Sequence, residues 1–274
     1  MSMPMIELYP DYAELFGSYH SVDDFLEIDV DLVRDFKNRK TGRFEIDGKG
    51  FYIKKHFECG LGAVLDELFH LRKPHIGAGH ERAVLDTLHT IGIETMKVAA
   101  FGQEGKTLAG QRSFLVTEEL TLVESLEDVC ASWPKEKPVE AFKKALLKEV
   151  AGIARTLHDN GINHRDFYIC HFLLDVSNLS NDHQNQPPKL FLIDLHRAQQ
   201  RPNVPFRWRV KDIGGLYFSA MDIGLTQRDL FRFMRLYTGK SLRKTLREDL
   251  RFWNAVRCRA VKIYRKEFGC LRGT

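Results

Sequence analysis

Two aspartates in the middle of the chain stand beside short apolar runs. Asp166 ends the tripeptide HRD, six residues before the apolar run 172–174, and Asp194 directly follows the apolar run 190–193. A carboxylate beside a buried strand must be solvated, paired with a cation or bound to a metal ion. The spacing therefore predicts an acidic site at the ends of two neighbouring short strands.

Together the two motifs resemble the catalytic core of protein kinases, in which H-R-D-x-x-x-x-N precedes a strand pair and D-F-G. Here His171 stands at the asparagine position, and Asp194 is followed by Leu195 and His196. The stretches NHRDFYICHFLL and LIDLHRAQ, which carry these departures, resemble the lipopolysaccharide core heptose I kinases of the WaaP/RfaP family. The 3-deoxy-manno-octulosonic acid (Kdo) kinases are relatives. The resemblance extends from about residue 43 to about residue 226.

The resemblance implies an α+β, protein-kinase-like fold of two lobes. Residues 1–120 would form a small β-rich lobe with one key helix, and residues 121–274 a larger helical lobe. It also implies a phosphotransferase that uses ATP and Mg²⁺ to phosphorylate heptose I of the lipopolysaccharide inner core. The alternatives are a Kdo kinase, a protein kinase, or a catalytically weak kinase-like module that binds anions.

Phosphoryl transfer needs positioning and charge neutralisation more than covalent help from the protein. In the kinase plan Asp166 orients the attacking hydroxyl, and Asp194 holds magnesium. His171 is a candidate second metal ligand, although imidazole suits Mg²⁺ less well than oxygen donors. It would otherwise act through water, bind a phosphate, or only order the loop. Asp212 is expected at a helix start, where it would brace the backbone of the catalytic loop.

The first lobe should supply a lysine and a glutamate. Residues 43–57 are typical of a hairpin around Asp47-Gly48, and residues 79–91 of a helix. Glu81 lies on the apolar stripe of that helix, where a carboxylate needs a cation. Lys54 and Lys55 point to opposite faces of the second strand. The family pattern of an aliphatic residue, Lys, any residue and His favours Lys54; Lys55 and a surface role for both remain alternatives.

Further strands are expected at 97–101 and 113–117. They lead to Glu118-Glu119-Leu120, a connector between lobes. In the kinase plan the backbone of Glu118 and Leu120 would bind adenine. A long amphipathic helix is expected at 138–158, and mostly helix from residue 210 onward. No GxGxxG motif is present, so the phosphate-binding loop is not assigned.

Positive charge is concentrated toward the C-terminus. Residues 228–273 hold fourteen Lys and Arg against four Asp and Glu, although the whole chain carries only +4. Such a region favours an anionic partner, or it is a solvated helix face. Its interleaved aromatic residues are either interfacial anchors or the core of the lobe. We expect no nucleic acid, but an acidic soluble protein on this basic or apolar surface is an alternative to a membrane. Arg197, Arg207 and Arg209 are candidate ligands for the anionic inner-core acceptor.

Cellular location is predicted from features that the sequence lacks. No run of about 18 apolar residues occurs, and the first residues do not form a signal peptide. The five cysteines are scattered and form no CxxC pair, which argues against a zinc site or disulfides. We therefore expect a cytoplasmic protein, with a peripheral position at the inner membrane as an alternative.

Overall fold

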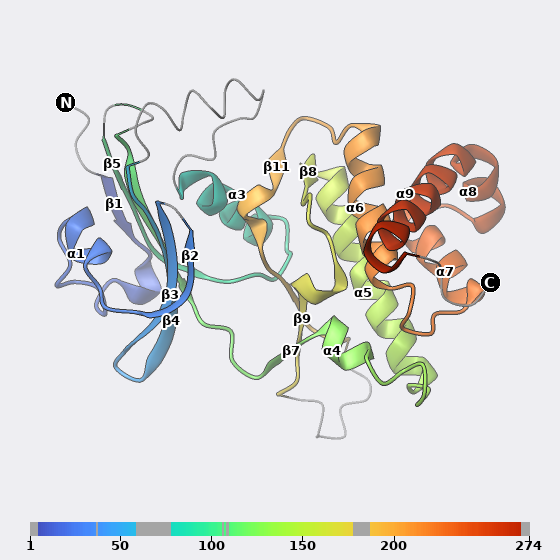
Figure 1. Ribbon diagram of the computed structural model, residues 1–274, viewed down its shortest axis with the longest axis horizontal. Helices are drawn as coiled ribbons and strands as arrows, with labels where there is room; N and C mark the ends of the chain where they lie inside the picture. Colours follow the sequence, from blue (N-terminus) through green and yellow to red (C-terminus); the bar gives the residue numbers. More distant parts are fainter. Residues whose placement is uncertain are drawn as a thin grey trace. The chain divides into compact units, whose positions relative to one another are not determined.

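The computed structural model describes residues 5–36, 38–58, 78–105, 107, 110–177 and 187–269. The chain divides into two compact units, residues 1–86 with 96–120 and residues 87–95 with 121–274 (Figure 1). It passes from the first unit to the second within helix α3 (Gly79–Thr90) and again after Leu120. Residues 87–95 thus belong with the second unit, although they lie inside the range expected for the first lobe.

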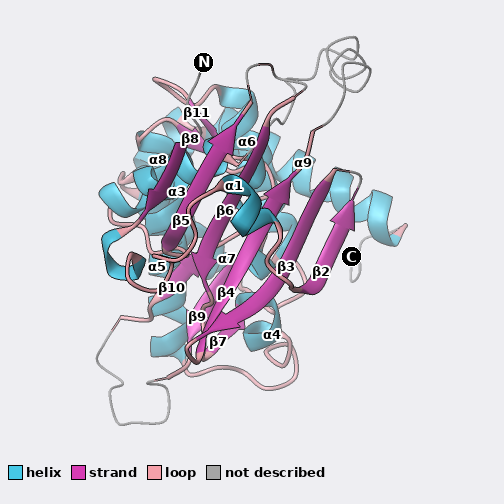
Figure 2. Ribbon diagram, turned by 90° about the vertical axis from the view of Figure 1, so that its left-hand side faces the viewer, coloured by secondary structure: helices cyan, strands magenta, loops and turns pink. Residues whose placement is uncertain are grey.

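A six-stranded antiparallel sheet in the order β1-β5-β6-β4-β3-β2 forms the first unit (Figure 2). The predicted hairpin is present as β3 and β4, and it turns through Asp47 and Gly48 at positive φ. The strands are β1 (Met5–Leu8), β2 (Asp31–Phe36), β3 (Arg39–Ile46), β4 (Lys49–His56), β5 (Val98–Glu104) and β6 (Arg112–Glu118).

An aromatic core packs against this sheet. Part of this core comes from residues that precede the β3–β4 hairpin in the chain. The 3-10 turn η1 (Pro10–Tyr12) and helix α1 (Val22–Leu26) bring in Phe16 and Phe25, both fully buried. Phe25 stacks on Phe114 at 4.0 Å between ring centroids, and Phe16 meets Phe51 edge-on at 5.2 Å. Aromatic pairs in such geometry stabilise by about 0.5–1.5 kcal/mol beyond burial. The N-terminal segment is therefore part of the first unit's core.

Helices make up most of the second unit. They are α4 (Leu126–Cys130), α5 (Glu140–Asp159), α6 (Phe206–Ser219), α7 (Gln227–Thr238), α8 (Leu242–Glu248) and α9 (Leu250–Phe268). The predicted long helix is α5, which buries Leu146, Val150 and Leu157 along one face. Helix α6 packs closely on α9, since a Cβ at Gly214 would lie 2.6 Å from the Arg259 side chain.

Two small strand groups enclose the acidic motifs. Strands β10 (Leu190–Leu192), β9 (Phe172–Asp175) and β7 (Val123–Ser125) form one antiparallel sheet, and β8 (Ile162–Asn163) pairs with β11 (Gln199–Gln200). The HRD segment follows β8, and Asp194 follows β10. The HRD segment lies between β8 and β9, and Asp194 lies between β10 and β11. Since β8 pairs with β11 and β9 with β10, the two strand pairs flank both motifs.

The aromatic residues of the C-terminal helices belong to the core. Tyr237, Phe252 and Tyr264 are buried, and the first two rings stack at 5.9 Å. Exposed large apolar side chains there are few, with Leu250 and Phe268 among them. The buried rings of Tyr237, Phe252 and Tyr264 therefore cannot anchor the protein at a membrane interface, and that alternative is wrong for them. No helix in the described ranges is long and apolar enough to cross a bilayer.

Candidate active site

Asp212 fixes the backbone that precedes Asp166, the candidate catalytic aspartate. Its carboxylate is 1% exposed and accepts hydrogen bonds from the N–H groups of His164 at 2.7 Å and Arg165 at 2.8 Å. Arg165 adopts a left-handed conformation at φ 76°, which is rare for a residue with a side chain. Asp212 lies in the middle of α6 and not at a helix start, because this helix already begins at Phe206.

His164 links the two acidic motifs. Its Nε2 lies 2.9 Å from the carbonyl oxygen of Ile193, so Nε2 must carry the hydrogen that is donated. Burial lowers the pKa of His164, which favours the neutral ring. The HRD segment is thereby tied to the residue directly before Asp194.

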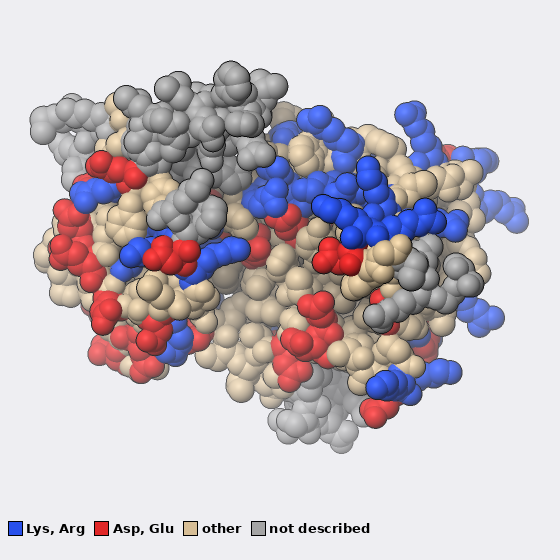
Figure 3. Space-filling view, in the orientation of Figure 1, with Lys and Arg blue, Asp and Glu red and all other residues tan. Residues whose placement is uncertain are grey.

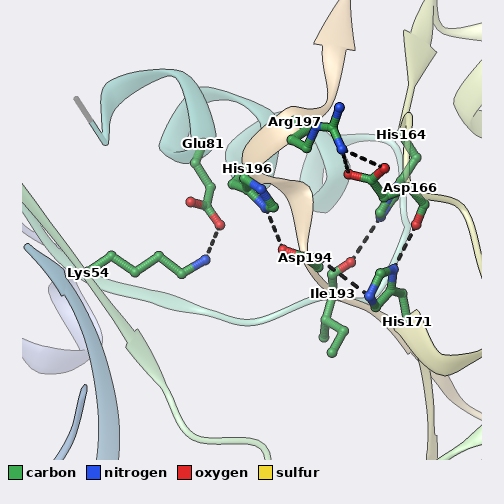
Figure 4. Close-up of polar contacts among 9 residues, drawn as sticks. All are labelled: Lys54, Glu81, His164, Asp166, His171, Ile193, Asp194, His196 and Arg197. Atoms are coloured by element: carbon green, nitrogen blue, oxygen red, sulfur yellow. Dashed lines mark hydrogen bonds and ion pairs between the residues drawn. The ribbon is translucent and has the colours of Figure 1, made fainter. Parts of the chain in front are cut away.

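Asp166 is held by a guanidinium group (Figure 4). Arg197 Nη1 donates to both carboxylate oxygens of Asp166, at 2.9 and 2.8 Å. Arg197 comes from the 3-10 turn η3 (Leu195–Arg197), which directly follows Asp194. The side chain that sequence analysis assigned to the acceptor thus contacts the candidate catalytic aspartate itself.

Asp194 lies between two imidazole rings. Its backbone is left-handed at φ 62° and ψ 50°. His196 Nδ1 hydrogen-bonds one carboxylate oxygen, and His171 Nε2 lies 3.5 Å from the other. His171 Nδ1 also donates to the Asp166 carbonyl at 2.7 Å, so this ring spans both motifs. Burial lowers the pKa of His171, but contacts with Cys170 and Asp166 and the charge of Asp194 outweigh it and raise the pKa to about 9.

Asp194 supplies the oxygen donor that magnesium prefers, whereas the two imidazole rings beside it offer nitrogen. No group of three or more His, Cys, Asp or Glu that could hold a metal ion occurs in the part of the chain that the structure describes. Mg²⁺ commonly binds through one or two carboxylates and completes its shell with substrate phosphates and water. Asp194 fits as such a carboxylate. His171 offers a nitrogen donor instead of an oxygen. Its position beside Asp194 suits orienting that carboxylate as well as binding a metal ion.

In the first unit, Lys54 of β4 pairs with Glu81 in the first turn of α3 (Figure 4). The two side chains are 16% and 5% exposed, and Lys54 Nζ hydrogen-bonds Glu81 Oε1. Lys55 points to the other face of the sheet, where its Nζ donates to the Ile28 carbonyl. Burial lowers the pKa of Lys55. Of the two candidate lysines, the structure therefore pairs Lys54 with Glu81.

The connector side chains contact the sheet of the first unit. Glu118 ends β6, donates its N–H to the Lys97 carbonyl at 2.9 Å and accepts a hydrogen bond from the Tyr12 hydroxyl at 2.6 Å. Glu119 pairs with Arg43 at 2.8 Å. Leu120 follows outside the strand. The side chains of Glu118 and Glu119 are thus engaged with Tyr12 and Arg43. Adenine binding by this connector would therefore use its backbone, and that role stays a prediction.

The remaining predicted acceptor ligands separate on α6. Arg207 lies 5.1 Å from the Trp208 ring, whereas Arg209 donates to the Tyr237 hydroxyl at 2.9 Å and stacks over Phe252 at 5.3 Å. Arg209 is thus engaged with the helical core. The contact of His196 with Asp194 was not predicted, although its place two residues after Asp194 was the available signal.

Comparison with known proteins agrees with this geometry. The profile of the "Lipopolysaccharide kinase (Kdo/WaaP) family" matches residues 23–237. The chain belongs to this family. The lipopolysaccharide core heptose(I) kinase WaaP of Escherichia coli is 40% identical over 259 residues, covering 94% of this chain and 97% of that relative. The enzyme of the same name from Pseudomonas aeruginosa is 40% identical over 241 residues, or 86% and 87%.

A solved structure described as "WaaP in complex with acyl carrier protein" is also similar. It aligns with a TM-score of 0.79 and 35% identity, over 95% of this chain and 99% of that chain. The expected family, the kinase-like α+β fold and phosphotransferase activity are therefore confirmed.

Proposed function

We propose that this protein transfers the γ-phosphoryl group of ATP to a hydroxyl of heptose I in the lipopolysaccharide inner core. The reaction would occur at the cytoplasmic face of the inner membrane. The observation that carries the proposal is 40% identity to heptose(I) kinases over 94% of the chain. The connection between the two acidic motifs supports it. His171 contacts both Asp166 and Asp194, and His164 hydrogen-bonds the carbonyl of Ile193.

Asp166 is the proposed catalytic residue. It would orient the attacking hydroxyl and accept its proton as the new phosphate ester bond forms. The contact with Arg197 orients the carboxylate before the acceptor arrives. When the acceptor hydroxyl binds, one oxygen of Asp166 must be free to face it.

The remaining proposed roles concern the nucleotide. Mg²⁺ bound at Asp194 would neutralise charge on the β- and γ-phosphates. Lys54 would contact phosphate oxygens, and Glu81 would fix the position of its ammonium group. The backbone of Glu118 and Leu120 would hydrogen-bond adenine.

A Kdo kinase is the second candidate, because the matching family includes both activities in its name. The test uses purified protein, ATP, Mg²⁺ and two defined acceptors, one heptosylated inner core and one that carries Kdo without heptose. Mass spectrometry with fragmentation locates the added phosphate. We expect it on heptose I. Phosphate on Kdo would establish the second candidate instead, and no transfer to either acceptor would overturn both.

We also propose an acyl carrier protein as a partner of the second unit. The similar solved structure was determined with such a protein. The second unit contains a cavity of about 520 Å³ whose lining is mainly apolar, including Leu146, Val150, Leu216 and Trp253. The basic residues of α7 to α9 complement an acidic surface. An acidic protein that presents an acyl chain matches both features.

A further inference from the structure

Four cations surround a single indole ring in the second unit. The charged groups of Arg165, Arg201, Arg207 and Lys211 lie 5.1, 5.7, 5.1 and 5.5 Å from the centroid of Trp208. Each distance is within the range of a cation–π contact. We call these five residues the Trp208 cluster. Figure 3 shows Lys and Arg side chains gathered in a broad area over α6 and α9.

Separate elements build the Trp208 cluster. Arg207, Trp208 and Lys211 lie within the first two turns of α6. Arg165 enters from the catalytic loop through its left-handed backbone. Arg201 follows β11, and its guanidinium group donates to Asn163 Oδ1 at 2.6 Å. The left-handed backbone thus sets where Arg165 enters the cluster, and the contact with Asn163 positions Arg201.

The cluster lacks negative charge of its own. The carboxylates that act on its cations are Asp166 and Asp212, and both have other partners: Arg197 holds the first, and two backbone N–H groups bind the second. Neither Arg207 nor Lys211 makes an ion pair with any carboxylate of the described ranges. Like charges packed together around one ring are destabilising unless an anion joins them.

Hydrogen-bond donors are also in excess. Arg165 Nε and Trp208 Nε1 are buried and have no acceptor among the residues that the structure describes. Burial lowers the pKa of Lys211, the charge of Asp166 opposes that shift, and the charge of Arg197 adds to it. Lys211 therefore lies within electrostatic reach of the proposed catalytic aspartate.

We infer that the Trp208 cluster binds an anionic group of the sugar acceptor, a carboxylate or a phosphate, beside Asp166. This inference rests on the proposed function and specifies how the acceptor is recognised. Guanidinium and ammonium groups form short, charge-assisted hydrogen bonds with both kinds of anion. Arg207 and Lys211 supply charges that no carboxylate of the described residues holds in an ion pair. Arg209, which is engaged with Tyr237, is not part of the site.

Steady-state kinetics with three acceptors test the inference. They are deacylated heptosylated inner core, the same acceptor with its carboxyl groups reduced, and the same acceptor after dephosphorylation. For Arg207→Gln and Lys211→Gln we expect the KM for the intact acceptor to rise roughly tenfold, as loss of one charge-assisted hydrogen bond predicts. The KM for ATP should stay within about twofold. Whichever modified acceptor no longer distinguishes the variants from wild type identifies the anion.

Lys148→Gln is the matched control, because Lys148 is an exposed cation on α5 outside the cluster. Lys211→Arg should retain most of the affinity. A raised KM for ATP would assign the cluster to the nucleotide and overturn the inference. An equal loss with all three acceptors would also overturn it, since charge would then not be recognised.

Failure of the proposed function can be told apart from failure of the site. If the wild-type protein phosphorylates no acceptor, calorimetric titration with free Kdo and with inorganic phosphate decides. Binding of either anion by wild type that weakens about tenfold in Lys211→Gln supports the site. Absence of binding, or equal binding by both proteins, excludes it.

Discussion

At the scale of single residues, Asp166 has two partners that prepare it for different tasks. Arg197 binds its carboxylate, and His171 binds its carbonyl. The first contact fixes the direction of the carboxylate, and the second connects the loop to His171, which lies beside Asp194. A change confined to the carboxylate should therefore alter chemistry without removing the connection to His171 and Asp194.

Asp166→Asn should lower kcat by about 100-fold or more, since a positioned base contributes about 10² to 10⁴ in rate. ATP affinity and the melting temperature should change little, because the backbone contact to His171 remains. Transfer assays and fluorescence titration with a nucleotide analogue measure the two effects. Asp159→Asn, at the exposed end of α5, is the control. A variant with near-normal turnover would exclude Asp166 as the base.

The two adjacent lysines of β4 provide a second test. Lys54→Met should raise the KM for ATP at least tenfold, because it removes the cation held by Glu81. Lys55→Met should leave this KM within about twofold, since Lys55 donates to the Ile28 carbonyl on the other face of the sheet. The two variants differ by one position and have the same change in charge. Equal effects on KM would reject the assignment of Lys54.

Much of the site at residue scale could be predicted from motif spacing. Spacing located Asp166 and Asp194, and strand alternation with the family pattern favoured Lys54. The separation of Arg207 from Arg209 could not be read in the same way. Both lie on α6, and their directions depend on Trp208, Tyr237 and neighbouring helices that meet only in the folded unit.

At the scale of elements, the β8–β11 pair determines how the HRD segment is presented. Gly161 precedes β8 at φ 75°, and a Cβ added there would lie 1.7 Å from the Arg201 carbonyl oxygen. The Arg201 N–H donates to the Gly161 carbonyl at 2.9 Å. Both a left-handed backbone and a close approach therefore require glycine at this position.

Gly161→Ala should destabilise the protein by about 2 kcal/mol or more, from left-handed strain together with the steric clash. Its KM for the acceptor should rise as well, because Arg201 would shift. Gly152→Ala is the control: Gly152 lies exposed inside α5 with no atom near an added Cβ, so the change should stabilise by about 0.5–1 kcal/mol. Thermal unfolding measures both. A Gly161→Ala protein as stable as wild type would contradict this account.

The longer elements and the short apolar strands β9 and β10 could be predicted, but the two-residue strands could not. The β3–β4 hairpin, α3 and α5 carry apolar patterns over eight or more residues. Strands β8 and β11 are two residues long, and no periodicity can be detected over such a length. The early start of α6 was missed because its first turn is rich in arginine and lies beside Pro205.

At the scale of the whole molecule, the charge of the C-terminal helices predicts how a partner is recruited. Arg243, Lys244 and Arg247 are exposed on α8. Reversing all three to Glu should weaken binding of an acyl carrier protein about tenfold at low salt, and the difference should shrink as salt rises. Titration calorimetry measures this binding, and co-sedimentation with anionic vesicles compares a membrane surface.

Reversal of Lys135, Lys137 and Lys148 is the control, because it changes the net charge equally outside this region. If the control weakens binding as much, only net charge matters. If neither triple variant affects the carrier protein or the vesicles at any salt concentration, the region is a solvated helix face. The sequence located this charge, but it could not show which interleaved aromatic residues are buried.

The passage of the chain through α3 limits how the protein can be dissected. Residues 87–95 comprise the last turn of the helix that carries Glu81 and the segment after it, yet they belong to the second unit. There the Thr95 hydroxyl donates to the Leu192 carbonyl at 2.6 Å, and the Leu192 N–H donates to the Glu94 carbonyl at 2.9 Å. A gene fragment that begins after codon 120 would therefore lack residues 87–95, which belong to the second unit. To express the second unit alone, residues 87–95 must be attached to it through a linker. A split-protein reporter built on this enzyme needs two junctions instead of one.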